Sequence, residues 1–245
     1  SSEARANAVN KHYSDRAVVL RTIPLGEADR IITLMTEAHG RVRAVAKGIR
    51  RTTSKFGSRL EPTTHVSLQL YIGRELDTIT QAETIAHMPN TRDDLRRFSR
   101  ANVMMETVDT MSPEKEPNPA LYRMLVGALT TLDHKDSPLV LAGFLLKLLS
   151  LEGFQPQLDV CVACGSASNL VAFDVDDGGL RCINDRRGVA VDPEAIFLMR
   201  QILGGQLNAA LQEPESPSTA EVEAIAVAVV EHHIERRLRA ARTRL

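Results

Sequence analysis

The first part of the chain alternates apolar and polar residues at the two-residue spacing of β-strands. In RVRAVAKGI, Val42, Ala44 and Ala46 are expected to face one way and the residues between them the other. The runs AVVLRTI, DRIITLMT, HVSLQLYI and LDTITQAETI also read as strands, with GRE as a hairpin turn between the last two. Five short strands within about 70 residues predict a small closed or nearly closed barrel, because so small a sheet must hide its edges.

After Pro89 the apolar residues follow a helical spacing. One helix is expected from a cap at Thr91, and another from a cap at Asn118 that is followed by a proline. The run SPLVLAGFLLKLLSLEGF is apolar on nearly every face, which predicts the buried centre of a helical bundle. DPEAIFLMRQIL predicts a short helix.

The last 27 residues, TAEVEAIAVAVVEHHIERRLRAARTRL, predict one long terminal helix. Its apolar stripe is expected to pack on the bundle, and it consists of Val227, Val230, Ile234 and Leu238. Arg236 and Arg239 share another row with His232, which makes a modest basic stripe available to DNA or a partner.

Composition supports an ordinary folded protein with aliphatic cores. Of 245 residues, 43% are hydrophobic and 25% charged, aromatic residues total only 4%, and tryptophan is absent. No apolar run approaches the ~18 residues of a membrane span, and the polar start SSEARANAVNKHYS lacks the apolar centre of a signal peptide. We therefore expect a cytoplasmic protein without a membrane partner.

These patterns divide the chain into four parts. The expected parts are a disordered or vector-derived N-terminus over 1–15, a barrel over 16–87, a helical domain over 88–157 and 191–245, and a small ribbon-like insert over 158–190. The fold class is α+β and multidomain.

One stretch is strongly basic although the net charge of the whole chain is only −1. Its cations are Arg41, Arg43, Lys47, Arg50, Arg51, Lys55 and Arg59. A solvated sheet face is the ordinary explanation, but such faces usually mix both signs of charge. A small barrel with a basic face, hydroxyl groups and Phe56 favours nucleic acid, with phosphates bound by the cations and bases stacked on the aromatic ring.

All three cysteines lie within the insert, as CVACG followed by a Gly-Gly turn and LRC. The odd number and close spacing favour a reduced chain with a local metal site over a disulfide framework. Cys161, Cys164 and Cys182 supply three zinc ligands, and Asp185 stands where a second Cys-x-x-Cys would place the fourth. The alternatives are Asn184, a water or a distant histidine as fourth ligand, or a ribbon that has lost its metal and holds its shape by packing.

No pattern in the chain indicates catalysis. EHHIER is not the His-Glu-x-x-His pattern of zinc peptidases, and no histidine is near the cysteines in sequence to serve as a base. Asp174, Asp176 and Asp177 are interpreted as turn residues. We expect a protein that is not an enzyme.

The segment RAVVLRTIPLGEADRIITLMTEAHGRVRAVAKGIRRTTSKFGSRLEPTTHVSLQLYIGRELDTITQAE resembles the N-terminal barrel of the RecO family of recombination and repair mediators. LLKLLSLEGFQPQLDVCVACG followed by GGLRCINDRRG resembles the family's central helix and zinc-ribbon insert, and HHIERRLRAAR its closing helix. The resemblance runs from about residue 16 to the end of the chain.

The resemblance implies an N-terminal OB-fold, a helical domain and a zinc-ribbon insert. It implies binding to single- and double-stranded DNA, annealing of complementary strands, and help to RecA in displacing single-strand-binding protein (SSB), together with RecR and through the acidic SSB tail. It also implies a bacterial protein associated with the nucleoid. The family's ribbon commonly has four cysteines, so Asp185 is a departure from its pattern.

Two other classes remain open from the residues. An OB barrel with a ribbon also suits an RNA-binding accessory factor of transcription or translation. A hydrolase built on Cys161, Cys164, Cys182 and Asp185 is the third possibility.

Overall fold

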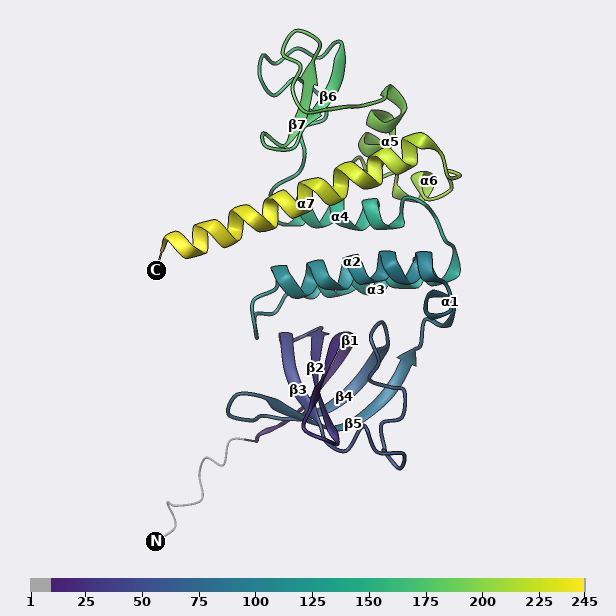
Figure 1. The fold of residues 1–245 in the computed structure, drawn as a ribbon, viewed down its shortest axis with the longest axis vertical. Helices are drawn as coiled ribbons and strands as arrows, with labels where there is room; N and C mark the ends of the chain where they lie inside the picture. The colour runs from purple at the N-terminus through teal and green to yellow at the C-terminus, as the bar shows by residue number, and fades with distance from the viewer. Residues whose placement is uncertain (1–9, 245) are drawn as a thin grey trace. The chain divides into compact units, whose positions relative to one another are not determined.

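The computed structural model describes residues 10–244, and these form two compact units. One unit comprises the chain up to Pro89 together with residues 108–126, and the other comprises residues 90–107 and 127–245. The chain passes from one unit to the other after Pro89 and again within the helices α2 (Leu95–Met111) and α3 (Pro119–His134), which are labelled in Figure 1.

Five strands of the first unit form a closed barrel in the order β1-β2-β3-β5-β4. The strands are β1 (His12–Leu25), β2 (Asp29–Thr36), β3 (Gly40–Ala46), β4 (His65–Tyr71) and β5 (Asp77–Ala86). Neighbours pair antiparallel except β3 and β5, which close the barrel with a short parallel pairing at Ala44 and Val45. The predicted five-stranded barrel is confirmed.

Strand β1 begins before the barrel start predicted at residue 16. His12 pairs with Tyr71 and Asp15 with Leu68 of β4, so these polar residues belong to the sheet. The weak apolar character of this segment hid the strand, because its side chains alternate between exposed and half-buried positions. Residues 1–9 of the predicted N-terminal segment lie outside the described residues.

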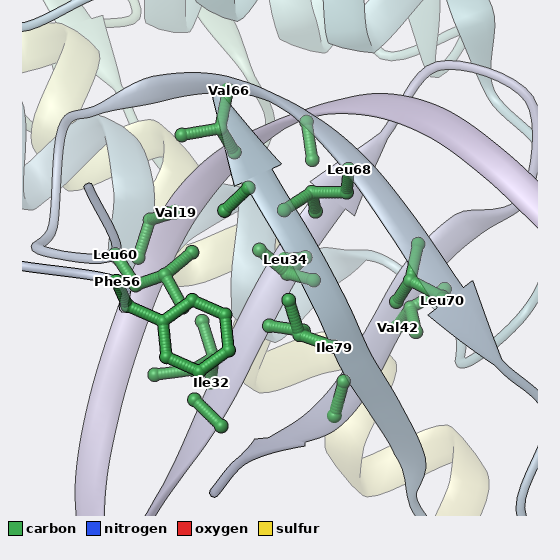
Figure 2. Close-up of a cluster of buried hydrophobic side chains, with 14 residues drawn as sticks. Val19, Ile32, Leu34, Val42, Phe56, Leu60, Val66, Leu68, Leu70 and Ile79 are labelled. Carbon is green, nitrogen blue, oxygen red and sulfur yellow. The ribbon is translucent and has the colours of Figure 1, made fainter. Parts of the chain in front are cut away.

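The barrel interior is filled by inward-facing aliphatic side chains and by two residues of the β3–β4 loop (Figure 2). Val42, Ala44 and Ala46 all face this core, as their alternation predicted. Phe56 and Leu60 enter it from the loop, each only 1% exposed. The expectation that Phe56 stacks on nucleic-acid bases is therefore wrong, because its ring lies inside the protein.

The segment after α2 lies against β3 within the same unit. The backbone N–H of Lys115 donates to the carbonyl of Arg41 at 2.9 Å, and Glu114 forms a β-bridge with Arg41. Gly40 has a φ of +71°, and an added Cβ would lie 2.0 Å from the backbone oxygen of Glu116. A side chain at Gly40 would thus require the segment to move away.

The second unit is built mainly from helices. The helices of the described residues are α1 (Pro89–Arg92), α2 (Leu95–Met111), α3 (Pro119–His134), α4 (Val140–Leu151), α5 (Pro193–Leu203), α6 (Leu207–Ala210) and α7 (Pro217–Thr243), of which α2 and α3 belong partly to the first unit. The sequence predicted α4 as the buried centre, and most of its residues are indeed buried.

The two helix starts expected from capping residues had different outcomes. Asn118 accepts the backbone N–H of Leu121 at 3.2 Å, which confirms its cap on α3. Thr91 does not cap α2. Asp94 does, accepting the N–H groups of Arg96 and Arg97, while the N–H of Thr91 donates to Asp133.

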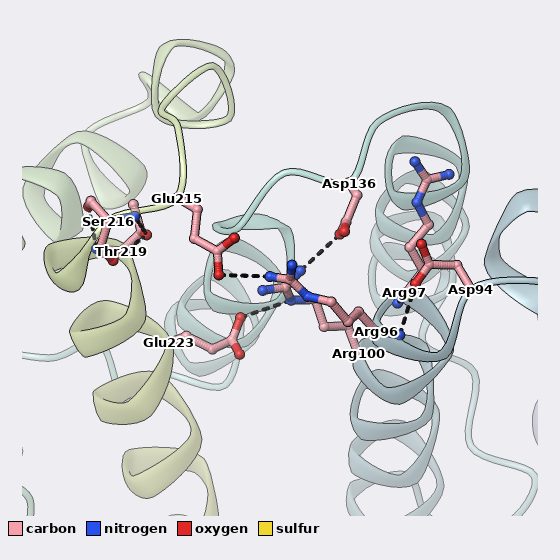
Figure 3. A network of polar contacts seen from close by, with 9 residues as sticks. All are labelled: Asp94, Arg96, Arg97, Arg100, Asp136, Glu215, Ser216, Thr219 and Glu223. Carbon is pink, nitrogen blue, oxygen red and sulfur yellow. Dashed lines mark hydrogen bonds and ion pairs between the residues drawn. The ribbon is translucent and has the colours of Figure 1, made fainter.

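An ion-pair network links the start of α2 to α7 within the second unit (Figure 3). Arg100 donates to Glu223 at 3.0 Å and to Asp136 at 2.8 Å, and Arg96 pairs with Glu215 at 2.8 Å. α7 itself starts with a capping box at Ser216.

The insert is a small three-stranded sheet in the order β7-β6-β8. Its strands are β6 (Leu170–Asp174), β7 (Gly179–Cys182) and β8 (Val189–Ala190). The turn between β6 and β7 contains Asp176 and Asp177, as predicted, whereas Asp174, which was also expected in the turn, is the last residue of β6.

The buried stripe of α7 differs from the one that the sequence predicted. Its buried members are Ser218, Thr219, Val222, Ile225, Ala226, Val229, Val230 and His233. Leu238 is 50% exposed, and Val227 and Ile234 are only half-buried, so Val230 alone of the predicted four is buried. Helical periodicity gave the spacing correctly, but α4 and α5, the helices that α7 packs against, determined which row faces inward.

This stripe gives a test of the faces of α7. We expect Val222→Asp to destabilise the helical unit by about 3 kcal/mol or more, because a carboxylate would replace a fully buried methyl pair. Leu238→Asp is the matched control, and its effect should stay within about 0.5 kcal/mol. Thermal unfolding followed by circular dichroism measures both, and equal losses would contradict the assigned faces.

Candidate functional site

The basic stretch occupies two different environments. Arg41 and Arg43 lie on the outward face of β3 and are half-buried. The Arg41 guanidinium donates to the carbonyl of Ser112 at 2.8 Å and pairs with Asp109 at 3.5 Å. Arg41 therefore already holds the segment that follows α2.

The remaining cations lie on the β3–β4 loop and are exposed. They are Lys47, Arg50, Arg51, Lys55 and Arg59. Among residues 10–244, none of these five side chains forms an ion pair with a carboxylate. Their charge is therefore directed to solvent and is available to an external anion.

Backbone contacts hold the first part of this loop against the β1–β2 turn. The N–H of Gly48 donates to the Asp29 carboxylate at 2.7 Å, and the N–H of Arg50 donates to the carbonyl of Ala28 at 2.9 Å. The Arg50 guanidinium reaches the carbonyl of Gly26 at 2.9 Å.

The second part of the loop is fixed by Phe56 and Leu60 inside the barrel. Next to them, Lys55 donates to the carbonyl of Thr80 at 3.0 Å, and Arg59 donates to the carbonyl of Lys55 at 2.8 Å. The loop is thus anchored at both ends, and its cations are presented from a defined backbone. Sequence reasoning identified the charges but not this anchoring.

The C-terminal part of α7 carries the other predicted cations. Arg236 and Arg239 are exposed, and Arg239 lies 3.7 Å from Glu235 in an exposed i,i+4 pair. Such a pair contributes little and is readily exchanged for another anion. His232, in the same row, lies 3.7 Å from Asp176 of the ribbon turn.

The four predicted metal ligands meet at one point of the ribbon. The sulfur atoms of Cys161, Cys164 and Cys182 and a carboxylate oxygen of Asp185 all lie within 4.8 Å of one another. The sulfurs of Cys164 and Cys182 are 3.7 Å apart, and the sulfur of Cys182 is 3.6 Å from Asp185 Oδ2. A tetrahedron with zinc–sulfur bonds of about 2.3 Å has edges of about 3.8 Å, so these separations fit zinc.

The local backbone explains why the first two cysteines converge. The N–H of Cys161 donates to the carbonyl of Ser166 at 2.8 Å, and the N–H of Gly165 donates back to Cys161 at 2.9 Å. Gly165 has a φ of +79°, which a residue with a side chain adopts only at a cost. The resulting tight knuckle faces Cys182, which ends β7.

The thiols of the knuckle have unequal acidities. Burial raises the pKa of Cys161, but the backbone N–H groups of Cys182, Cys164 and Ala163 outweigh it and lower the pKa to about 7. At Cys164 the Ser166 N–H favours the thiolate, yet hydrogen bonding to Asp185 and Cys182 raises the pKa to about 12. Without a bound cation, Cys161 is therefore the thiol that deprotonates more readily, and Cys164 keeps its proton.

A buried ion pair braces the ribbon, and the sequence did not predict it. The Arg181 guanidinium donates to Asp174 Oδ2 through Nε at 3.0 Å and through a terminal nitrogen at 2.8 Å. It also reaches Asp177 at 2.6 Å. Arg181 directly precedes Cys182 of the thiol cluster, so this pair fixes the end of β7.

Comparison with known proteins gives one family match for the barrel and a second for the helical part that carries the ribbon. Residues 11–88 match the family described as "Recombination protein O N terminal", and residues 92–242 match "Recombination protein O C terminal". The chain is 45% identical over 234 residues to the DNA repair protein RecO of Frankia casuarinae, a match that covers 93% of this chain and 96% of the relative. It is 42% identical over 237 residues to the DNA repair proteins RecO of a Nocardioides species and of Cutibacterium acnes, with the same coverage.

The two matched family models both describe a recombination protein, and together they cover the barrel and the helical part with its ribbon. The chain belongs to the RecO family. Within residues 10–244, no helix has both the length and the apolar character to cross a membrane.

Proposed function

We propose that this protein binds single- and double-stranded DNA and anneals complementary strands, and that it helps load RecA onto SSB-coated DNA together with RecR. The observation that carries the proposal is the set of five exposed cations on the anchored β3–β4 loop, which form no ion pair with a carboxylate among residues 10–244. It acts as a mediator and not as an enzyme. Location at the bacterial nucleoid would follow from DNA binding.

The proposed contact is mainly with phosphate. Lysine and arginine side chains neutralise phosphates of any sequence, whereas base stacking would need exposed aromatic rings on the same surface. Phe56, the aromatic residue of the loop, is buried. Binding should therefore depend strongly on salt and little on base sequence.

Arg41 and Arg43 form the half-buried edge of this surface, and Arg236 and Arg239 form a second contact on α7. Arg41 should contribute less to DNA affinity than the loop cations, because it is only partly exposed and already contacts Ser112 and Asp109. The exposed face of α7 around Arg239 is well suited to DNA or to an acidic partner segment.

We expect the double variant Lys47→Ala/Arg51→Ala to weaken binding to unrelated DNA sequences by a similar factor. The slope of log affinity against log salt should fall by about 0.7–0.9 for each lost phosphate contact. The matched control is Arg74→Ala/Arg123→Ala, which removes the same charge from exposed positions outside the loop. An unchanged slope in the loop variant would move the DNA surface elsewhere, with the α7 arginines as the next candidates.

Annealing of complementary strands coated with the cognate SSB, with and without RecR, tests the mediator role. Annealing should be faster with this protein and should need the loop cations. Loss of stimulation when the SSB lacks its acidic tail would support the tail as the contact. Preference for structured RNA over single-stranded DNA would favour the RNA-binding alternative.

We further propose that Cys161, Cys164, Cys182 and Asp185 hold a structural zinc ion. The supporting observation is that the four ligand atoms lie within 4.8 Å of one another and that the sulfurs of Cys164 and Cys182 are 3.7 Å apart, close to the edge of a zinc–thiolate tetrahedron. Zinc would cross-link the knuckle to the end of β7, in an insert that is too short to bury a large core.

We also propose the division of the chain into an N-terminal segment, a barrel, a helical domain and a ribbon insert. In this division the barrel begins at His12 instead of residue 16.

The fourth ligand gives a direct test of the zinc site. We expect Asp185→Cys to retain zinc more firmly than the wild type during dialysis against a mild chelator, because a thiolate is a softer ligand than a carboxylate. Elemental analysis of zinc per chain measures the difference. Metal in neither protein would rule out the ligand set, while annealing should be unaffected in both.

A further inference from the structure

The three cysteines of the ribbon differ in their access to solvent. Cys161 is 1% exposed and Cys182 is 3% exposed, whereas Cys164 is on the surface. All three are free thiols, and the sulfur of exposed Cys164 lies 3.7 Å from that of buried Cys182. The ribbon thus combines one thiol that a small oxidant can reach with a second thiol in contact with it.

We propose that Cys164 and Cys182 form a reversible disulfide when the protein meets hydrogen peroxide, and that this oxidation opens the metal cluster. Cys164 is the residue attacked by peroxide, and Cys182 is the one that completes the bond. The release of zinc in this inference rests on the proposed structural zinc, whereas the disulfide does not.

The chemistry balances with peroxide as the two-electron oxidant. The Cys164 sulfur attacks one peroxide oxygen, the O–O bond breaks, and the thiol proton passes to the other oxygen, which leaves as water, so that Cys164 becomes a sulfenic acid. The Cys182 sulfur then attacks the Cys164 sulfur, the S–O bond breaks, and a second water leaves as the disulfide forms. Two thiols lose one electron each, and peroxide is reduced to two waters.

The geometry requires only a small movement. A disulfide has sulfurs about 2.05 Å apart, so rotation of exposed Cys164 toward Cys182 would close the gap that remains. The disulfide would join the knuckle directly to the end of β7. Zinc, when bound, would connect the same two segments. The ribbon can therefore keep its shape in the oxidised form.

Oxidation removes two of the four ligands. The remaining Cys161 thiolate and Asp185 carboxylate are too few for a structural zinc site, which takes four protein ligands. The oxygen ligand at Asp185 weakens the site further, because zinc at such sites is held mainly by thiolates. Reduction by a dithiol would restore all three cysteines and the site.

Tryptic peptides of this chain separate the possible pairings. Cleavage after Lys147, Arg181 and Arg186 places Cys161 and Cys164 in the peptide 148–181 and Cys182 in the peptide 182–186. A bond between Cys164 and Cys182 links these two peptides, whereas a bond between Cys161 and Cys164 is internal to the first. Fragmentation between Cys161 and Cys164 then assigns the linked cysteine.

The experiment treats the purified full chain with a small excess of hydrogen peroxide in the presence of a colorimetric zinc chelator. We expect loss of two of the three free thiols, linkage of the two peptides through Cys164, and release of the bound zinc. Dithiothreitol should return the three thiols. Cys164→Ser should give no linked peptides, and circular dichroism checks that this variant, which lacks one proposed ligand, is still folded.

Each other outcome has a defined meaning. A bond within the peptide 148–181, linkage through Cys161, or sulfinic acid without linkage would overturn the assigned pair. Peptide linkage that persists in Cys164→Ser would overturn the role of Cys164. Linkage through Cys164 in a chain that carried no zinc beforehand would confirm the disulfide and refute the structural zinc.

Discussion

Phe56→Ala is expected to destabilise the barrel by about 3–5 kcal/mol, the usual cost of truncating a buried aromatic side chain. The Phe56 ring is 1% exposed and packs among the aliphatic residues of the barrel core (Figure 2). The cavity left behind would also free the β3–β4 loop from its anchor, so DNA affinity should fall as a secondary effect. Urea unfolding followed by far-ultraviolet circular dichroism measures the stability, since the chain has no tryptophan.

Phe56→Leu separates packing from base stacking. Leucine fills much of the same space, so this variant should lose less than about 1.5 kcal/mol and keep nearly all DNA affinity. A stacking residue would behave differently, because leucine has no ring to stack on a base. Stability that is unchanged in Phe56→Ala, combined with lost DNA binding, would contradict the assigned core position.

Arg181→Ala is expected to destabilise the ribbon by about 3–5 kcal/mol, because it leaves a buried carboxylate without its partner. The side chain of Asp174 is 3% exposed and that of Arg181 11%. Since Arg181 adjoins Cys182, we also expect weaker zinc retention. Hydrogen exchange of the ribbon amides reports the local stability, and elemental analysis reports the metal.

The pH dependence of this effect follows from the pKa of Asp174. Burial raises the pKa of the carboxyl, but the Asp177 N–H and the Arg181 guanidinium outweigh it and hold the pKa below its ordinary value. In the wild type, the stabilisation by Asp174 is present above the ordinary pKa of about 4 and is lost as the pH falls through the lowered value. In Arg181→Ala the guanidinium no longer stabilises the carboxylate, so the pKa of Asp174 rises relative to the wild type. The loss of stability should therefore be largest at neutral pH and should shrink as Asp174 becomes protonated.

Arg187→Ala is the matched control. The Arg187 side chain is 59% exposed and lies 3.6 Å from Asp174 and 3.2 Å from Asp176. An exposed pair of this kind contributes about 0–1 kcal/mol, so the ribbon should remain protected in the variant. Equal losses in Arg181→Ala and Arg187→Ala would refute the central role of the buried pair.

Several elements could be predicted because their signals are local. Alternation along β3 predicted that Val42, Ala44 and Ala46 face the core, since a strand turns successive side chains to opposite sides. Asn118 and the following proline predicted the start of α3. The spacing of Cys161 and Cys164 and the distance to Cys182 predicted that the three thiols lie close together, because a knuckle and a hairpin bring such positions together.

Other features depended on residues far away in the chain. The sequence could not show that Phe56 enters the barrel, because an aromatic residue in a basic loop suits stacking as well as packing. It did not reveal that Arg41 is paired with Asp109, or that Arg181 is buried against Asp174. In each case a side chain's role depends on the partner that the fold brings to it.

The sequence by itself determined the barrel strands, the main helices, the thiol cluster and the excess of positive charge after β3, because each is written in the spacing and type of neighbouring residues. Only the tertiary structure decided which row of α7 is buried, which arginines are paired, and which cations remain exposed to solvent. These depend on long-range packing, and the free energy of burying a side chain is set by what surrounds it and not by its neighbours in sequence.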